Sequence, residues 1–290
     1  MDRYEWHPDV PPEFRDNIVV SDVLEGLRRL PDASVPLFLF SPPYNLGTST
    51  GGGIQAYRSH CGADKPLGKR GGRGDRGKCR WAGGQLANGY DDYDDARPHA
   101  EYVQWQKDIL TECWRCLTPN GAIFYQHKPR ILAGVLVDPL DYVPGDLRPY
   151  VRQRVIWARA GGVNATPAFY MPMQEQIIII ARPAWRLRDQ SAGAIGDVWR
   201  ISQEIDTWHP APFPLALALR VMETTAAPMV CDPFCGSGTT AKAAKTVGAH
   251  WLGFDRNAAY VKRANEEVAV LQPLPYAHPS SQAGLFTEVA

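Results

Sequence analysis

The segment Pro228–Asp255, PMVCDPFCGSGTTAKAAKTVGAHWLGFD, decides the fold because it reads as strand, glycine-rich turn, helix and strand in succession. We expect the first strand to end at Asp232, the helix to open near Thr239 and the second strand to end at Asp255. Glycines in the turn let the backbone approach a ligand closely, and the helix N-terminus offers unpaired N–H groups. This spacing predicts a βαβ nucleoside site in which Asp255 accepts hydrogen bonds from both ribose hydroxyls.

The type of nucleoside cofactor stays open on this segment alone. The turn lacks the lysine of a phosphate-binding G-x-x-x-x-G-K-[ST] loop. Gly236, Gly238 and Ala241 give the pattern G-x-G-x-x-A, which the dinucleotide fingerprint tolerates. A nicotinamide site and a site for another adenosine-containing cofactor are therefore both compatible with the spacing.

Elsewhere the chain alternates short apolar runs with helix-like stretches, which is typical of an α/β fold with a largely parallel sheet. Further strands are expected at 17–22, 35–40, 121–127, 150–159 and 175–182, and helices at 23–32, 99–117, 213–226 and 258–270. We expect one domain over residues 1–272 and a loose, proline- and serine-rich tail at 273–290.

The composition is ordinary for a soluble globular enzyme, with 290 residues, 44% hydrophobic and 21% charged. Its apolar runs are far shorter than the roughly 20 residues that span a bilayer, and the first residues show no secretory pattern, so we expect a cytoplasmic protein without a membrane partner.

Six cysteines in a chain of this length do not indicate a disulfide framework, and we expect no metal site. The C-x-x-C pair Cys113 and Cys116 falls in an amphipathic stretch, and the group of His60, Cys61 and Cys79 lacks a second close-spaced pair. Four other histidines show no convincing partner in the sequence and are expected to be surface or packing residues: His7, His99, His127 and His250.

The formal net charge is zero, but the charge is unevenly distributed. A glycine-rich insert at 46–89 shows no sustained periodicity, and its composition predicts a loop or disorder in the free protein. Between positions 65 and 80 it sets a single acid, Asp75, against Lys65, Lys69, Arg70, Arg73, Arg76, Lys78 and Arg80. Local charge of this kind bears on a polyanionic partner, whereas the net value does not.

A second informative stretch, FLFSPPYNLG at residues 38–47, leaves an apolar run through a serine, two prolines and a tyrosine. Proline fixes the backbone direction and donates no hydrogen bond. Taken alone, the stretch is compatible with a functional motif and equally with a proline-rich turn after a buried strand, with Tyr44 as a core aromatic residue.

Together, SPPYN and DPFCGSGTT resemble the amino-methyltransferases of DNA, whose [DNS]-P-P-[YFW] motif follows one strand and whose cofactor loop reads F-x-G-x-G. Because SPPY comes first, the motif order is similar to that of the beta group, a circular rearrangement of the usual methyltransferase chain. The resemblance covers most of the chain outside the insert and the tail. It implies a Rossmann-like methyltransferase fold, with a mostly parallel seven-stranded sheet and helices on both faces, and S-adenosylmethionine (SAM) as cofactor.

The resemblance also implies a role for each residue of the tetrad Ser41–Tyr44. The Ser41 side chain and the Pro42 carbonyl would accept the hydrogens of an exocyclic amine, so that the nitrogen lone pair can point at the methyl group. Pro43 helps to fix the backbone, and Tyr44 stacks on a base that has left the duplex. The cofactor residues implied are Asp22, Asp232, Phe234, Cys235, Gly236, Ser237, Gly238, Thr239 and Asp255. Asp22 reads equally as a helix N-cap, and both roles are compatible.

The first residue of the tetrad bears on the target base. Serine is associated in the family with cytosine N4 and aspartate with adenine N6, so we favour cytosine N4 and keep adenine N6 as the alternative. Cytosine carbon-5 methylation is excluded because the chain has no Pro-Cys pair to supply that nucleophile. Methylation of RNA or of protein amides is more distant, since those enzymes generally carry the two motifs in the opposite order. A non-catalytic DNA-binding relic is disfavoured because both motifs are intact.

The resemblance implies double-stranded DNA as the partner. The basic insert directly follows the tetrad, and we expect Arg70, Arg73 and Arg76 to contact DNA, with a functionally neutral solvated loop as the alternative. The small segment 184–208 sits where the family usually carries its target-recognition region. A cognate restriction endonuclease, a homodimer and association with a prokaryotic nucleoid are further expectations.

Overall fold

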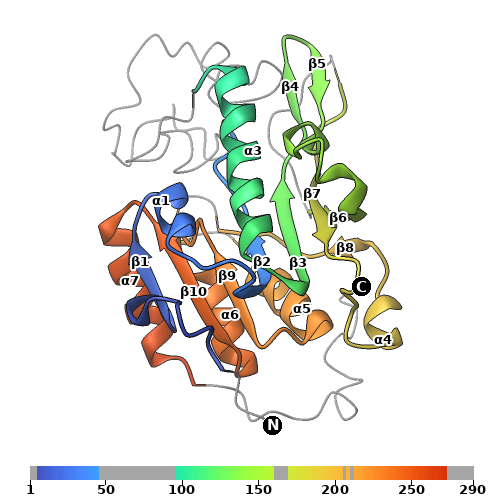
Figure 1. The fold of residues 1–290 in the computed structure, drawn as a ribbon. Coiled ribbons are helices and arrows are strands. Elements are labelled where there is room, and N and C mark those ends of the chain that lie inside the picture. The colour runs from blue at the N-terminus through green and yellow to red at the C-terminus, as the bar shows by residue number, and fades with distance from the viewer. Residues whose placement is uncertain (1–4, 46–95, 160–168, 205–206, 210–211, 273–290) are drawn as a thin grey trace, which may run out of the picture.

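An eight-stranded sheet forms the centre of the computed structural model, which describes residues 5–45, 96–159, 169–204, 207–209 and 212–272 (Figure 1). The strand order is β1-β10-β9-β2-β3-β7-β6-β8. The strands are β1 (Asn17–Val20), β2 (Val35–Phe40), β3 (Leu117–His127), β6 (Val151–Ala158), β7 (Gln174–Ala181), β8 (Val198–Arg200), β9 (Met229–Asp232) and β10 (His250–Asp255).

The sheet is mostly parallel, as the sequence predicts. Pairing is parallel from β1 through β10, β9 and β2 to β3, whereas β7 runs antiparallel to both β3 and β6. The fold class is confirmed, but the sheet has eight strands in the described part of the chain instead of the predicted seven. The additional strand is β8, a three-residue strand within the 184–208 segment that pairs in parallel with the end of β6.

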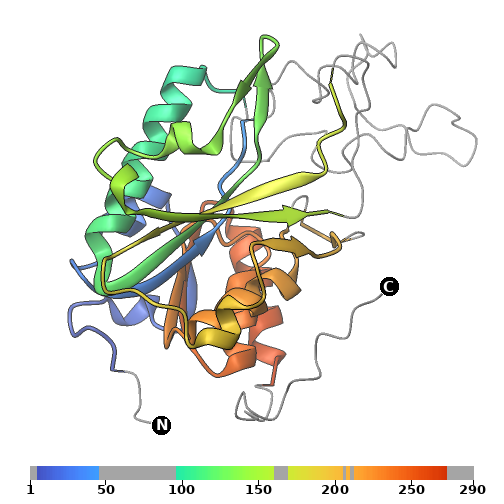
Figure 2. The same cartoon turned by 90° about the vertical axis from the view of Figure 1, so that its right-hand side faces the viewer.

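Helices cover both faces of the sheet (Figure 2). On one face lie α1 (Val23–Arg28) and α3 (His99–Cys116), and on the other lie α5 (Leu215–Thr225), α6 (Thr239–Val247) and α7 (Ala258–Val270). The short helix α4 (Gln190–Gly193) contacts α5. Each fully buried aliphatic side chain between these layers contributes about 2 kcal/mol of hydrophobic stabilisation. None of the helices in the described ranges is long and apolar enough to cross a membrane.

The sequence pattern of α3 explains why its C-x-x-C pair belongs to the core. Buried side chains recur every three or four residues, as an amphipathic helix requires, and Cys113 and Cys116 fall on this buried face. Burial raises the pKa of both thiols, that of Cys116 to about 12. The described residues contain no cluster of histidine, cysteine and acidic side chains that could hold a metal ion, while His60, Cys61 and Cys79 lie outside those residues.

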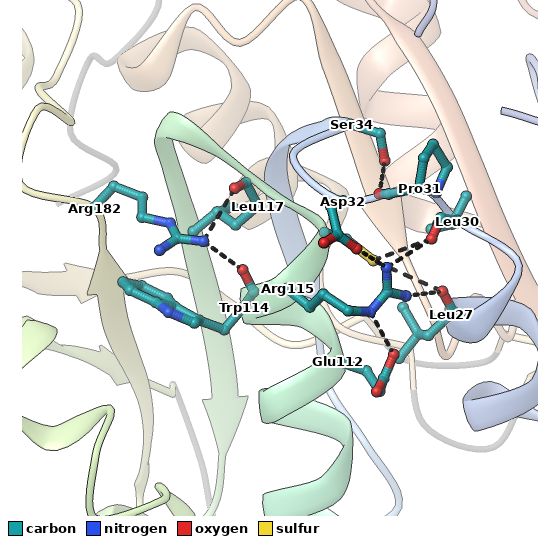
Figure 3. A network of polar contacts seen from close by, with 11 residues as sticks. Leu27, Leu30, Pro31, Asp32, Ser34, Glu112, Trp114, Arg115, Leu117 and Arg182 are labelled. Atoms are coloured by element: carbon teal, nitrogen blue, oxygen red, sulfur yellow. Dashed lines mark hydrogen bonds and ion pairs between the residues drawn. The ribbon is translucent and has the colours of Figure 1, made fainter. Parts of the chain in front are cut away.

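Arg115, in the last turn of α3, ties that helix to the α1–β2 connection (Figure 3). Its guanidinium donates to the carbonyl oxygens of Leu27 and Leu30, each at 2.9 Å, and pairs with Asp32 at 2.6 Å and Glu112 at 3.0 Å. Because the planar fork meets four acceptors at fixed angles, this contact fixes the C-terminal end of α3.

A second arginine holds the same helix end from the side of β7. Arg182 donates to the Trp114 carbonyl oxygen at 2.7 Å, and its guanidinium lies 3.9 Å from the Trp114 ring centroid (Figure 3). The end of α3 is therefore joined to the chain on both sides, which fixes the course of the helix beside β2 and β3.

The strand order changes direction between β9 and β2. From β9 the chain passes through α6 to β10, whereas from β2 it leads through α3 to β3 on the other side, and the two helices lie on opposite faces. In open α/β sheets, ligands bind outside the carboxyl ends of the strands at such a switch point. We call this edge of the sheet the carboxyl edge, and both sequence motifs leave the sheet there.

Smaller elements complete the described chain. A hairpin of β4 (Arg130–Leu132) and β5 (Val135–Val137), which the sequence pattern does not predict, stands above the carboxyl edge (Figure 1). Three-residue and four-residue 3-10 helices lie at η1 (Pro12–Phe14), η4 (Pro139–Tyr142) and η5 (Arg148–Tyr150). The insert 46–89 and the tail 273–290 lie outside the described residues.

Candidate active site

The tetrad Ser41–Tyr44 directly follows β2, and the loop Asp232–Thr239, which we call the cofactor loop, directly follows the neighbouring β9. Two contacts tie them together. The Thr240 hydroxyl oxygen lies 3.4 Å from the Leu39 carbonyl oxygen, and the rings of Phe40 and Phe234 have centroids 5.9 Å apart. Two motifs almost 200 residues apart in sequence therefore lie side by side at the switch point.

The two carbonyl groups of the proline pair, Pro42 and Pro43, differ in whether they already accept a hydrogen bond. The Pro43 carbonyl accepts a hydrogen bond from the Tyr102 hydroxyl at 2.6 Å. No donor among the described residues reaches the Pro42 carbonyl oxygen. Of the two carbonyls, that of Pro42 is thus the one left to accept a hydrogen from a ligand, as the resemblance implies.

The Tyr44 hydroxyl is held inside the protein. It lies 2.7 Å from the Ser41 hydroxyl, donates to Glu175 Oε2 at 2.9 Å and receives the Gln126 side-chain amide at 3.3 Å. Burial, reinforced by the negative charge of Glu175, raises the pKa of Tyr44 well above its usual range, so the hydroxyl stays protonated. Sequence reasoning missed Glu175 and Gln126, because each lies on another strand with no motif around it.

His127 lies against the Tyr44 ring, with centroids 4.6 Å apart. Its Nε2 is 2.7 Å from the Tyr102 hydroxyl and its Nδ1 is 2.8 Å from the Lys128 carbonyl oxygen. Burial lowers the pKa of His127 to about 3, against the hydrogen bond to the Lys128 carbonyl oxygen, which raises it. The expectation that His127 lacks a partner is wrong, as is that for His250, whose Nδ1 lies 2.8 Å from Asp16.

Asp232 shapes the cofactor loop from inside. Its carboxylate accepts the Phe234 N–H at 2.9 Å and the Thr240 hydroxyl at 2.6 Å, which ties the start of the loop to the first turn of α6. The side chain is buried, and this burial raises its pKa to about 7. These contacts indicate that Asp232 orients the turn at the start of the cofactor loop, and a direct contact with the cofactor stays a prediction.

Asp255 reaches the loop from the end of β10. Its Oδ2 accepts the Gly236 N–H at 2.9 Å and its Oδ1 accepts the Asn257 N–H at 2.8 Å. Gly236 and Gly238 have φ of +48° and +74°, a region that L side chains rarely adopt, so the turn needs glycine at both positions. Gly238 is also the N-cap of α6.

The remaining loop residues pack inward. Cys235, Ser237 and Thr239 are buried, and the Ser237 and Thr239 hydroxyls lie 3.0 Å apart. Burial raises the pKa of the Cys235 thiol well above its usual range, so this cysteine is not a nucleophile. The Phe234 ring lies between Phe40 and Trp105, at centroid distances of 5.9 and 5.6 Å.

His209 closes over the loop, and sequence reasoning missed this contact. A Cβ atom placed on Gly236 would lie 2.6 Å from His209 Nε2, which shows how closely the ring approaches the backbone. Burial lowers the pKa of His209 to about 4. The available signal was its position in HPAPFP, the segment ahead of α5, where the following Phe213 is also buried.

Asp22 follows β1 at the same edge and acts as the N-cap of α1, with its carboxylate accepting the Leu24 N–H at 2.9 Å. The N-cap interpretation is confirmed, and a contact with the cofactor stays a prediction.

Two segments are expected to read DNA, and only one of them falls within the described residues. Arg70, Arg73 and Arg76 of the insert lie outside those residues. In the 184–208 segment, Arg188 donates to the Glu223 carbonyl oxygen at the C-terminal end of α5, at the edge opposite the tetrad, whereas Arg200 ends β8 beside Ala158. A target-recognition role for this segment stays a prediction.

A family model described as DNA methylase, for N6 and N4 amino-methyltransferases, matches residues 35–266 of the chain. The chain belongs to this N6/N4 DNA methylase family. The matched range runs from the first residue of β2 into α7, so the tetrad and the cofactor loop both fall inside the DNA methylase model.

Two curated DNA methylases are similar over most of the chain. Type II methyltransferase M.BglII of Bacillus subtilis is 25% identical over 288 residues, covering 87% of this chain and 68% of that protein. DNA adenine methyltransferase YhdJ of Escherichia coli K12 is 22% identical over 283 residues, covering 84% of this chain and 80% of that protein.

Solved structures of DNA methylases share the fold. TTHA0409 of Thermus thermophilus, a putative DNA modification methylase complexed with S-adenosyl-L-methionine, has a TM-score of 0.57 and 22% identity, covering 87% of this chain and 93% of that chain. The cytosine-N4-specific PvuII DNA methyltransferase has a TM-score of 0.59 and 16% identity, covering 89% and 93%. At these identities the likeness establishes the fold alone.

Proposed function

We propose that this DNA methylase transfers the methyl group of SAM to the exocyclic amine of a base in double-stranded DNA, with cytosine N4 as the favoured target. One observation carries the proposal. The tetrad and the cofactor loop leave two adjacent parallel strands, β2 and β9, at the switch point of the sheet. A methyl donor on one loop and an amine held by the other would meet there.

The residues at the end of β9 fit SAM. Gly236 and Gly238 bring the backbone close to a ligand, the first turn of α6 offers N–H groups, and Asp255 ends the second strand where a ribose acceptor belongs. The loop lacks the P-loop lysine, so a nucleoside without a polyphosphate fits better than a nucleotide triphosphate. SAM in the TTHA0409 complex supports the same choice of cofactor. When bound, SAM supplies an electrophilic methyl group.

The tetrad fits an amine. An exocyclic amine of cytosine or adenine is a poor nucleophile because its lone pair is delocalised into the ring. The Ser41 oxygen and the Pro42 carbonyl oxygen would accept its two hydrogens and favour a pyramidal nitrogen aimed at the methyl group. Catalysis then comes from positioning and electrostatics, and needs no covalent intermediate. Since His127 covers one face of the Tyr44 ring, a flipped base would stack on the other.

Ser41 favours cytosine N4, which is also the target named for the PvuII enzyme whose fold this chain shares. Adenine N6 is the alternative, supported by the relative YhdJ, whose name specifies adenine. The deciding experiment incubates the protein with SAM and unmethylated genomic DNA, digests the DNA to nucleosides and identifies the product by mass spectrometry. N4-methylcytosine is the expected product, N6-methyladenine would select the alternative, and methylation of RNA or protein in place of DNA would overturn the proposal.

The DNA partner rests on the family, and the type II relative M.BglII supports a role beside a restriction endonuclease. We propose that the basic insert 46–89 contacts the duplex, because it follows the tetrad directly and carries Arg70, Arg73 and Arg76. Both points, like the homodimer, are open to direct test by binding and sedimentation.

A further inference from the structure

We propose that Glu175 directs a hydrogen-bond chain through Tyr44 to Ser41, and so makes the Ser41 hydroxyl an acceptor toward the substrate amine. This inference rests on the proposed function and adds a positioning residue to it. Among the described residues, Glu175 has polar contacts with Tyr44, Gln126 and Arg159, so it acts on the tetrad through the Tyr44 hydroxyl.

The topology of the sheet brings Glu175 to the site. It is the second residue of β7, which runs antiparallel to β3 with His127 paired to Gln176. The N-terminal end of β7 therefore lies beside the C-terminal end of β3, at the carboxyl edge next to the tetrad. The Glu175 side chain is 9% exposed there, and its ion-pair partner Arg159 is 10% exposed.

The carboxylate of Glu175 can only accept hydrogen bonds, and its oxygens have defined donors. Oε1 lies 3.3 Å from the Arg159 guanidinium. Oε2 accepts the Gln126 amide N–H at 2.9 Å and the Tyr44 hydroxyl at 2.9 Å. Tyr44 has a single hydroxyl hydrogen, so donating it to Glu175 leaves the Tyr44 oxygen as an acceptor.

The next contact fixes Ser41. Its oxygen lies 2.7 Å from the Tyr44 oxygen, and one of the two must donate. Because the Tyr44 hydrogen is committed to Glu175, Ser41 is the donor and its only hydrogen points inward. The lone pairs of the Ser41 oxygen remain, and they can accept N–H groups but cannot satisfy an acceptor.

This polarity has a chemical consequence. A free serine hydroxyl could equally donate to a ring nitrogen of the base, which would hold the base in a non-productive way. With its hydrogen committed, Ser41 presents only acceptor character and selects the amine. A buried carboxylate at the inner end of the chain thus gives a neutral serine the hydrogen-bonding preference that an ionised aspartate has by itself.

The test replaces Glu175→Gln, which keeps the shape of the side chain. If the new amide oxygen faces Arg159, the NH2 group faces Tyr44 and reverses the chain, so that Ser41 donates toward the substrate. If the amide oxygen instead faces Tyr44, the NH2 group faces the Arg159 guanidinium, and two donors then oppose each other. We expect the single-turnover methylation rate to fall about 100-fold, the size seen when a preorganised hydrogen bond is removed from a catalytic site. The affinity for SAM, measured by calorimetry, should stay within threefold of wild type.

A double-mutant cycle separates this role from a merely structural one. Tyr44→Phe removes one oxygen atom and breaks the same chain, and we expect it alone to lower the rate at least tenfold. In that background Glu175→Gln should cost less than threefold more, because its route to Ser41 is already cut. Full additivity of the two losses would overturn the inference.

Two controls keep the result interpretable. Glu223→Gln makes the same chemical change on α5, at the opposite edge of the sheet, and should leave the rate unchanged. If Glu175→Gln does not fold by thermal melting, Tyr44→Phe alone decides, since a wild-type rate in that variant would overturn the inference. A wild-type protein that methylates no DNA would instead refute the proposed function, whereas an active wild type with an equally active Glu175→Gln variant would refute only the role of Glu175.

Discussion

Replacing Asp232 with asparagine is expected to change how the stability of the fold depends on pH. Burial raises the pKa of Asp232 from 3.8 to about 7, against the hydrogen bonds from Thr240 and Phe234, which lower it. Between these values the folded protein holds a proton that the unfolded chain releases. The contribution of Asp232 to the free energy of unfolding is therefore fully present below pH 4 and is lost as the pH rises through 7.

The expected size follows from the same two pKa values. At 1.36 kcal/mol per pKa unit, raising the pH from 5 to 8 should remove roughly 2.5 kcal/mol from the free energy of unfolding of the wild type through this group. Asp232→Asn resembles the protonated acid. Its amide oxygen can accept the Phe234 N–H and its amide nitrogen can donate to the Thr240 hydroxyl oxygen, so the turn keeps its contacts while the titration disappears.

Urea denaturation of both proteins at pH 5, 6, 7 and 8 measures this directly, because subtracting one curve from the other cancels the titrating groups that do not interact with Asp232. The variant should gain stability relative to wild type as the pH rises. Thr240→Val removes a hydrogen bond that lowers the Asp232 pKa. In that variant the stability contributed by Asp232 should therefore be lost at a higher pH than in wild type. A difference in the free energy of unfolding between wild type and Asp232→Asn that stays constant within about 0.5 kcal/mol across this range would show that Asp232 does not titrate there.

Three further predictions concern the loop, the helix anchor and DNA. Gly236→Ala places a side chain at φ +48° and 2.6 Å from His209, and should weaken SAM binding at least tenfold by calorimetry. The control Gly248→Ala, at φ +75° with open space around it, should cost about 1 kcal/mol of stability and leave SAM affinity unchanged. Arg115→Lys loses the planar guanidinium that meets two carbonyls and two carboxylates, and should lower the free energy of unfolding, measured in denaturant, by about 2 kcal/mol. The control Arg29→Lys, at an exposed ion pair, should lower it by less than about 0.5 kcal/mol. Replacing Arg70, Arg73 and Arg76 with alanine should weaken DNA binding. The slope of log affinity against log salt concentration should become shallower by roughly 0.9 for each phosphate that is no longer neutralised. Unchanged binding would contradict a role of the insert.

Local signals in the sequence predicted the central elements of the fold. The strand, turn, helix and strand of 228–255 are found as β9, α6 and β10, with α6 opening at Thr239 as predicted, because glycines and apolar periodicity act over a few residues. The short strand β8 escaped prediction, since three residues are too few to show a period. It is this strand that makes the sheet eight-stranded.

Contacts between distant strands could not be predicted. Glu175 lies 131 residues from Tyr44, and Gln126 lies 82 residues from it, so no motif joins them. The same holds for His250 and Asp16, separated by 234 residues. Such pairs follow from strand order and register, which the sequence leaves undetermined, and in the tetrad they decide the direction of the hydrogen bonds around the predicted residues.

We propose that the tetrad and the cofactor loop together move a methyl group from SAM to a DNA base. Transfer of radiolabelled methyl from SAM to DNA, compared between wild type and Ser41→Ala, tests it most directly. We expect label in the DNA with the wild type, and with Ser41→Ala at least a 100-fold slower transfer while calorimetric SAM binding is retained. Label absent from DNA with folded, SAM-binding wild type, or undiminished transfer by Ser41→Ala, would contradict it.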